Sequence, residues 1–177
     1  MSGRKQTRGF SIVELVVTLS IVAIFVAFAT PSLIGWSRTE KVKSGARDIS
    51  LGLQRAKSFA VKRGNNVIMA FNSPANGSYQ IVNDLNNNCV VNGGEAVLYS
   101  ASLGQGVEMP AGTITFSSNN AAFETRGLPL GDAAGACLPF GTGGASGGGS
   151  VTVEMPNHNV KYVVTMALAG GITVQRQ

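Results

Sequence analysis

The sequence contains little of what catalytic centres are usually built from. Of its 177 residues, only 13% are charged, one is histidine and two are cysteine. The single histidine, His158, lies in a predicted turn, and metal binding or acid–base catalysis would need partners that the sequence does not place nearby. We therefore assign no catalytic residue and no cofactor, and we do not expect an enzyme.

The glycine-rich stretch at residues 141–149 also lacks what a nucleotide or hydrolase motif requires. Gly144, Ser146 and Gly148 satisfy the pattern G-x-S-x-G, but neither the strand that should precede a nucleophile elbow nor the helix that should follow it is predicted here. The stretch has no lysine, which excludes a P-loop. We attribute the match to low complexity and predict a hairpin loop.

What the sequence does contain is a long apolar run behind a basic N-terminus. Arg4, Lys5 and Arg8 precede the run, and eight more basic residues lie between residues 38 and 63. The run covers residues 10–29, and about 20 residues at about 1.5 Å each would cross a hydrocarbon core of about 30 Å. Basic residues before such a segment orient it with that end in the cytoplasm. We therefore predict a helix that spans a membrane.

Glu14 is the one ionisable residue inside this run, and a lone carboxylate in lipid is costly unless it has a partner. The residues around it, Gly9, Phe10 and then Ser-Ile-Val-Glu-Leu, resemble a class III prepilin signal. The resemblance implies that a prepilin peptidase cuts between Gly9 and Phe10 and that Phe10 becomes N-methylated. It also implies that Glu14 pairs with the N-terminal amine of a neighbouring subunit, a cation that makes a buried carboxylate tolerable.

Two other interpretations of the segment stay open at this level. Ala27, Phe28 and Ala29 form an A-x-A pattern, so a signal peptidase could release a soluble protein beginning at Thr30. An uncleaved membrane anchor is the second alternative. The length of the run, the glutamate inside it and the spacing from the glycine favour the prepilin interpretation.

Beyond Pro31, which should kink or interrupt the helix, helical periodicity resumes as far as Gly64. Apolar residues at steps of four and three predict one buried stripe on an amphipathic helix, with basic residues on its other faces. The stripe consists of Val42, Ala46, Ile49, Leu53, Ala56 and Ala60. The basic faces could bind nucleic acid, but no aromatic stacking platform accompanies them, and a solvated surface is the favoured explanation.

After Gly64 the sequence changes to short runs rich in β-branched and aromatic residues, separated by turn residues. The expected strands are residues 67–71, 78–82, 96–100, 113–117, 150–155, 160–166 and 172–175. The fold class is therefore α+β: a long N-terminal transmembrane and assembly helix followed by a mainly antiparallel β-sheet head, together shaped like a ladle.

The junction between helix and sheet resembles the GspH/FimT-type minor pilins. The helix closes on Val-Lys-Arg-Gly-Asn and a strand begins at once with Asn-Val-Ile-Met, and the terminal strand follows Gly170 and Gly171. We divide the chain into a prepilin leader at 1–9, a transmembrane helix at 10–30, an amphipathic helix at 31–64 and a β-rich head at 65–177. Members implicated in DNA capture have a more basic chain end, whereas the last strand here offers only Arg176.

Cys89 and Cys137 both follow the apolar run and would lie on the translocated side of the membrane. An oxidising compartment would pair them in a disulfide; the alternative is two unrelated buried thiols.

The segment around Cys89 also has the oxygen spacing of a calcium loop. Asp84, Asn86, Asn88 and Glu95, together with Asn92, occupy ligand positions of such a loop. Cys89 stands where the loop wants glycine, however, and no helices are predicted to flank it. We favour an asparagine-rich surface loop held by the disulfide over a calcium site.

These observations predict a structural subunit of a type II secretion pseudopilus or a type IV pilus. Its expected partners are other pilin or pseudopilin subunits, the prepilin peptidase, the bacterial inner membrane and secreted cargo. The leader would face the cytoplasm and the head the periplasm. The alternative is a pilus-carried subunit that binds DNA or another ligand, with nucleic acid the less favoured partner.

Overall fold

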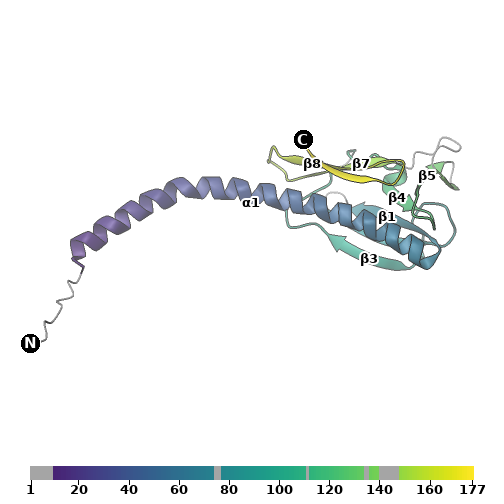
Figure 1. The fold of residues 1–177 in the computed structure, drawn as a ribbon, viewed down its shortest axis with the longest axis horizontal. Coiled ribbons are helices and arrows are strands. Elements are labelled where there is room, and N and C mark those ends of the chain that lie inside the picture. Colours follow the sequence, from purple (N-terminus) through teal and green to yellow (C-terminus); the bar gives the residue numbers. More distant parts are fainter. Residues whose placement is uncertain (1–9, 74–76, 111, 134–135, 140–147) are drawn as a thin grey trace, which may run out of the picture. The chain divides into compact units, whose positions relative to one another are not determined.

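The structure is a computed structural model, and it describes residues 10–73, 77–110, 112–133, 136–139 and 148–177 (Figure 1). The chain divides into two compact units, an N-terminal unit at Met1–Ser37 and a C-terminal unit at Arg38–Gln177, and each is considered by itself. The elements are, in order, helix α1 (Ile12–Arg63), strands β1 (Asn66–Ser73), β2 (Ser78–Asp84) and β3 (Val97–Ser102), the 3-10 turn η2 (Ser117–Asn119), and strands β4 (Asn120–Phe123), β5 (Pro129–Ala133), β6 (Ala136–Pro139), β7 (Gly149–Glu154), β8 (Lys161–Met166) and β9 (Ile172–Arg176).

Helix α1 begins and ends with local signals that the sequence carries. The Val13 N–H donates to Ser11 Oγ at 3.4 Å, and the first helical hydrogen bond runs from the Leu15 N–H to the Ser11 carbonyl at 3.1 Å. At the other end, Gly64 has a φ of +68°, which glycine adopts without steric cost, so the predicted stop is confirmed.

Pro31 was predicted to kink or interrupt the helix, and the interruption is wrong, because α1 is one element over 52 residues. A kink at this position stays a prediction. A proline removes one backbone N–H from a helix, while the turns on either side keep their hydrogen bonds. In a segment this long, the remaining bonds hold the helical backbone together. The division of the chain at residues 9, 30 and 64 stays a prediction.

The predicted antiparallel pairing is confirmed, and the strands of the C-terminal unit form two sheets. The first has the strand order β3-β2-β1-β4-β5-β6, and the second has the order β7-β8-β9. Figure 1 shows the C-terminal part of α1 between β3 on one side and β7 and β8 on the other. Both sheets therefore pack against the same stretch of helix.

The predicted apolar stripe of the helix forms the centre of this packing. All six residues are fully buried: Val42, Ala46, Ile49, Leu53, Ala56 and Ala60. They lie in one cluster with residues of both sheets, among them Met69, Phe123 and Val164. Close approach is possible because the helix carries glycine where the sheet is nearest. A Cβ on Gly52 would lie 2.9 Å from a Tyr79 ring carbon.

Six of the seven predicted strands are present, but residues 113–117 do not form one. The Thr113 N–H closes a turn on the Pro110 carbonyl at 3.1 Å. The Thr115 N–H donates to the Ser150 carbonyl at 2.9 Å, but the Ser150 N–H donates back to the Thr115 side chain at 2.7 Å. The hydroxyl thus replaces the carbonyl, and no ladder develops.

Strands β4, β5 and β6 were not predicted from the sequence. Their residues include alanine, glycine and proline, which have low strand propensity. They are ordered by pairing, because β4 lies along the open edge of β1 with Val67 opposite Phe123. Strands β5 and β6 then follow as hairpin partners.

Candidate functional site

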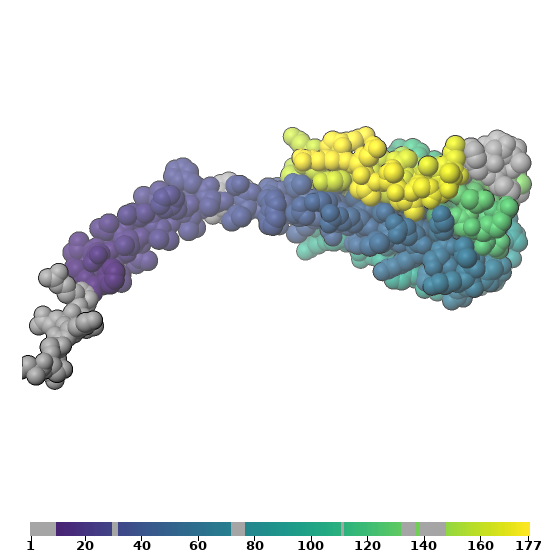
Figure 2. All heavy atoms as spheres, viewed as in Figure 1, coloured from purple at the N-terminus to yellow at the C-terminus, as the bar shows by residue number. Residues whose placement is uncertain are grey.

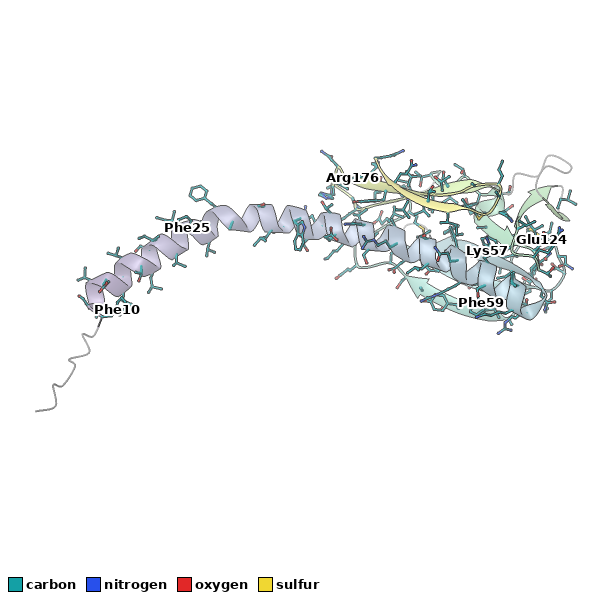
Figure 3. The ribbon with its side chains drawn as sticks, in the orientation of Figure 1. Phe10, Phe25, Lys57, Phe59, Glu124 and Arg176 are labelled. Atoms are coloured by element: carbon teal, nitrogen blue, oxygen red, sulfur yellow. A yellow bond between two sulfur atoms is a disulfide. The ribbon has the colours of Figure 1, made fainter. Side chains whose placement is uncertain are left out.

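The first part of α1 presents apolar side chains all around its surface. Every residue from 10 to 29 is exposed, and Phe10, Phe25 and Phe28 are 79%, 70% and 81% exposed. Figure 3 shows Phe25 projecting away from the helix. A helix that is apolar all round is normally buried in a protein core or a membrane. By length and composition this stretch of α1 is able to cross a membrane.

The hydroxyl groups in this stretch are satisfied by the helix itself. Thr18 Oγ1 donates to the Leu15 carbonyl at 2.9 Å, and Ser20 Oγ donates to the Val16 carbonyl at 2.8 Å. Both side chains can therefore enter hydrocarbon without an external partner. Glu14, in the first helical turn, has no salt bridge to any described residue. It is the group in this helix that most needs a partner from outside the chain.

Of the predicted processing site, only one side lies within the described part of the chain. Phe10 is described and lies two residues before α1, whereas Gly9 and the basic leader fall outside the described residues. Most of the G-x-S-x-G match, residues 144–147, falls outside them as well.

The predicted pairing of Cys89 with Cys137 is confirmed. The two residues form a disulfide with their Cα atoms 5.1 Å apart, which joins the loop after β2 to strand β6. Cys89 lies in a second buried cluster with Ile68, Ala122 and Leu130, on the face of the six-stranded sheet away from α1. The disulfide therefore fastens the asparagine-rich loop over that face.

Two family models match the chain. The model described as "Prokaryotic N-terminal methylation motif" matches residues 4–30, and the model described as "Type II transport protein GspH" matches residues 45–170. The second covers well over half of the sequence. The chain belongs to the GspH family. It is therefore a minor pilin or pseudopilin of a type II secretion system or a type IV pilus, membrane-anchored through its apolar helix and assembled with other pilin subunits.

The solved structure of a minor pilin shares this fold, and that of a minor pseudopilin is also similar. The type IV minor pilin FimU of Pseudomonas aeruginosa has a TM-score of 0.53 at 15% identity, over 79% of this chain and 92% of that one. The minor pseudopilin EpsH from the type 2 secretion system of Vibrio cholerae has a TM-score of 0.48 at 9% identity, over 76% of this chain and 96% of that one. No curated protein sequence matches this GspH-family chain.

In this GspH-family member, the oxygens of the predicted calcium loop serve as hydrogen-bond acceptors within the loop. The Asn88 N–H donates to Asp84 Oδ1 and to Asn86 Oδ1, each at 3.2 Å. The Val90 N–H donates to Asn88 Oδ1 at 2.9 Å, and the Asn92 N–H donates to Glu95 Oε2 at 2.8 Å. These bonds fit the asparagine-rich surface loop. Calcium binding stays the less favoured alternative, which these contacts do not test.

Several basic residues of α1 are engaged inside the C-terminal unit. The Arg55 guanidinium lies 4.7 Å from the centre of the Tyr99 ring, the Arg63 guanidinium lies 6.0 Å from the centre of the Phe59 ring, and Lys43 pairs with a glutamate at 3.3 Å. These contacts lie at the surface of the unit and are consistent with the solvated surface favoured from the sequence.

Two polar features of the C-terminal unit had no signal in the sequence. Burial, with a smaller contribution from the neighbouring Tyr99, raises the pKa of Tyr79 to about 12. His158, predicted in a turn, lies 3.1 Å from Thr39 Oγ1 through its Nε2 and so fastens the β7–β8 turn to α1. Figure 2 shows the C-terminal residues, in yellow, on the surface beside this part of the helix.

Proposed function

We propose that this subunit is made as a precursor, cleaved between Gly9 and Phe10 by a prepilin peptidase and methylated on the new N-terminal Phe10. Glu14 then receives the N-terminal amine of a neighbouring subunit as the apolar helices leave the bilayer and bundle. The observation that carries this proposal is the isolation of Glu14. The Thr18 and Ser20 hydroxyls bond to carbonyls of their own helix, whereas the Glu14 carboxylate has no salt bridge to a described residue.

The proposed orientation places the leader in the cytoplasm and the C-terminal unit in the periplasm of a bacterium. The basic residues before the apolar run support the first half of this statement, because lysine and arginine are retained on the cytoplasmic side. The Cys89–Cys137 disulfide supports the second half, because such bonds persist in the periplasm and are rare in the cytosol.

The processing step is tested by the intact mass and N-terminal sequence of the protein from cells with and without prepilin peptidase. We expect a mature chain that begins with methylated Phe10 and that disappears when the peptidase is absent. A chain beginning at Thr30 in both strains would mean release by signal peptidase and would contradict the proposal.

The assembly step is tested with Glu14→Gln, which keeps the shape of the side chain and removes its charge. Leaving a buried ammonium without its carboxylate costs about 3 kcal/mol or more, so incorporation into the fibre should fall by at least about a hundredfold. Membrane insertion and processing should be unchanged.

Thr18→Val is the matched control for this experiment. Its hydroxyl bonds to the carbonyl of its own helix, so its loss should leave incorporation at the wild-type level. Equal incorporation of Glu14→Gln and wild type would refute the role given to Glu14, while leaving the processing proposal intact.

Secreted cargo and DNA remain partners that the proposal allows without requiring. A role in DNA binding would be supported if charge reversal at Arg47 and Arg176, both exposed, abolished DNA retention while fibre incorporation stayed normal. Retention unchanged by these substitutions would exclude these positions as the DNA-binding surface.

A further inference from the structure

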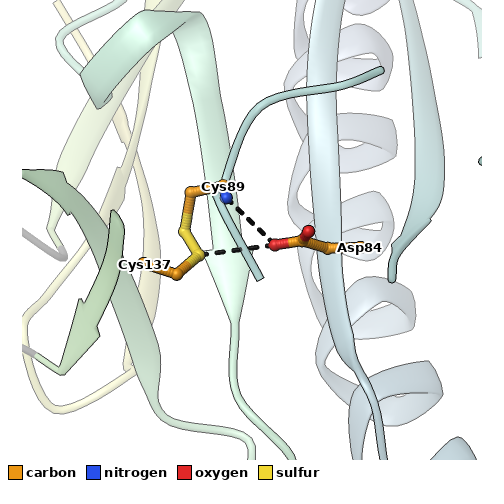
Figure 4. Close-up of side chains that lie close together, drawn as sticks. All are labelled: Asp84, Cys89 and Cys137. Carbon is orange, nitrogen blue, oxygen red and sulfur yellow. Dashed lines mark hydrogen bonds between the residues drawn. A yellow bond between two sulfur atoms is a disulfide. The ribbon is translucent and has the colours of Figure 1, made fainter. Parts of the chain in front are cut away.

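A buried carboxylate lies directly against the disulfide of the C-terminal unit. Asp84, the last residue of β2, is 1% exposed. Its Oδ2 accepts the Cys89 N–H at 3.0 Å and lies 3.4 Å from Cys137 Sγ, as Figure 4 shows. Its Oδ1 accepts the Asn88 N–H at 3.2 Å, and no salt bridge links it to a described lysine, arginine or histidine. Backbone amides, and no described cation, hold the charge there.

Asp84 caps the loop through both of its carboxylate oxygens, because Oδ1 accepts the Asn88 N–H and Oδ2 accepts the Cys89 N–H. The Asn88 N–H has a second acceptor in Asn86 Oδ1, also at 3.2 Å, so the Cys89 N–H is the donor that depends on Asp84. An asparagine at position 84 could supply one acceptor oxygen to the Cys89 N–H but would carry no charge. An aspartate therefore adds a second acceptor and a negative charge beside the sulfur atoms.

The two cysteines differ in exposure. Cys89 is 2% exposed, whereas Cys137 is partly exposed, so we expect a reductant in solution to attack at Cys137. In that reaction a thiolate attacks Cys137 Sγ, the sulfur–sulfur bond breaks, and Cys89 leaves as a thiolate. A second thiolate then attacks the mixed disulfide, so that two reductant thiols supply two electrons and depart joined to one another.

Each stage of that reaction brings a second negative charge close to Asp84. The attacking thiolate approaches the sulfur that lies 3.4 Å from Oδ2. The leaving thiolate of Cys89 forms within a cluster whose ligand atoms all lie within 4.8 Å of one another. Like charges at such distances in a partly buried site repel strongly.

We propose that Asp84 protects the Cys89–Cys137 disulfide against reduction, by opposing both the approach of anionic thiols and the formation of thiolate products. The residue acts through charge and not by touching a substrate, so it is a positioning and protecting residue. The inference is independent of the processing and assembly steps proposed above.

The test uses reductants of opposite charge on the full-length protein in a nonionic detergent. Reduction rates are measured with cysteamine, which is cationic, and with 2-mercaptoethanesulfonate, which is anionic. Each rate is divided by the rate of the same thiolate on a small neutral disulfide. We expect the wild type to be reduced about tenfold more slowly by the anionic thiol after this correction.

The comparison with the variant is diagnostic, because residues 65–177 carry six acidic and three basic residues and so disfavour the anionic reductant to some degree without Asp84. In Asp84→Asn the two corrected rates should agree within about twofold, with the larger acceleration for the anionic thiol. Asn86→Ala is the matched control. It removes the other acceptor of the Asn88 N–H and loosens the same loop, but it should leave the wild-type ratio unchanged.

A wild-type ratio near one would overturn the proposal, and this measurement does not depend on whether the variant folds. An unchanged ratio in a folded Asp84→Asn protein would also overturn it. Equal acceleration by both thiols in Asp84→Asn and in Asn86→Ala would show that Asp84 only holds the loop in place.

Discussion

Removing the disulfide should destabilise the C-terminal unit by an amount that follows from its place in the sequence. The bonded cysteines are 48 residues apart. In the chain-entropy model, a closed loop of that length restricts the unfolded chain by about 4 kcal/mol at 25 °C. Their Cα separation of 5.1 Å lies in the ordinary range for disulfides, so no distortion of the backbone should offset this stabilisation.

The measurement is urea unfolding of the full-length protein in nonionic detergent, followed by far-ultraviolet circular dichroism. We compare the wild type with the double variant Cys89→Ala and Cys137→Ala. We expect the free energy of unfolding to fall by about 4 kcal/mol, which is a large part of the roughly 5–15 kcal/mol typical of a domain. Wild type in excess reductant is the control, because reduction breaks the bond and keeps both sulfur atoms. A loss below about 1 kcal/mol in both samples would refute the reasoning, because the unfolded chain would then not be restricted by the cross-link as the model requires.

Further predictions concern packing, backbone conformation and pH. Leu53→Ala, at a fully buried position, should cost about 2–5 kcal/mol in urea unfolding, whereas Leu51→Ala, at a position 48% exposed, should change stability by less than about 0.5 kcal/mol. Gly77→Ala should cost at least about 1 kcal/mol more than Gly64→Ala, because both have positive φ but only at Gly77 would the new Cβ lie 2.5 Å from a carbonyl oxygen. Because the pKa of Tyr79 is raised to about 12, the contribution of its neutral side chain to the free energy of unfolding should be fully present below pH 10 and decline as the pH rises from 10 to 12. The urea midpoint of the wild type should therefore fall over this range, whereas that of Tyr79→Phe should lack this decline.

The helical half of the fold was predictable because its signals are local. Each helical signal lies within a few turns of the sequence: the apolar run at the start, the apolar stripe at steps of four and three, and Gly64 at the end. Burial of the stripe is confirmed at every one of its residues. At Pro31 the helix is not interrupted, because the loss of one hydrogen bond is outweighed by the helix on either side.

The strands were predictable only where their own residues carry a strand pattern of β-branched and aromatic side chains. Strands β1, β2, β7 and β8 are rich in β-branched residues and were found, whereas β5 and β6 contain glycine, alanine and proline. Strand β4 is ordered by pairing with β1, which is distant in the sequence, and β5 and β6 follow as hairpin partners. No window of residues reports such long-range pairing. The same holds for residues 113–117, where a threonine hydroxyl took the place of a backbone acceptor.

The candidate sites also differ in whether their residues lie close together in the sequence. Residues 9–14 place the processing and assembly features next to one another in sequence, so the chain's local pattern is enough to propose Phe10 and Glu14. The pairing of Asp84 with Cys137 joins positions 53 residues apart, and sequence spacing suggested calcium for Asp84 instead. In the fold, the Asp84 carboxylate is directed at backbone amides and a sulfur atom, a setting in which its charge acts on the redox chemistry of the cysteines.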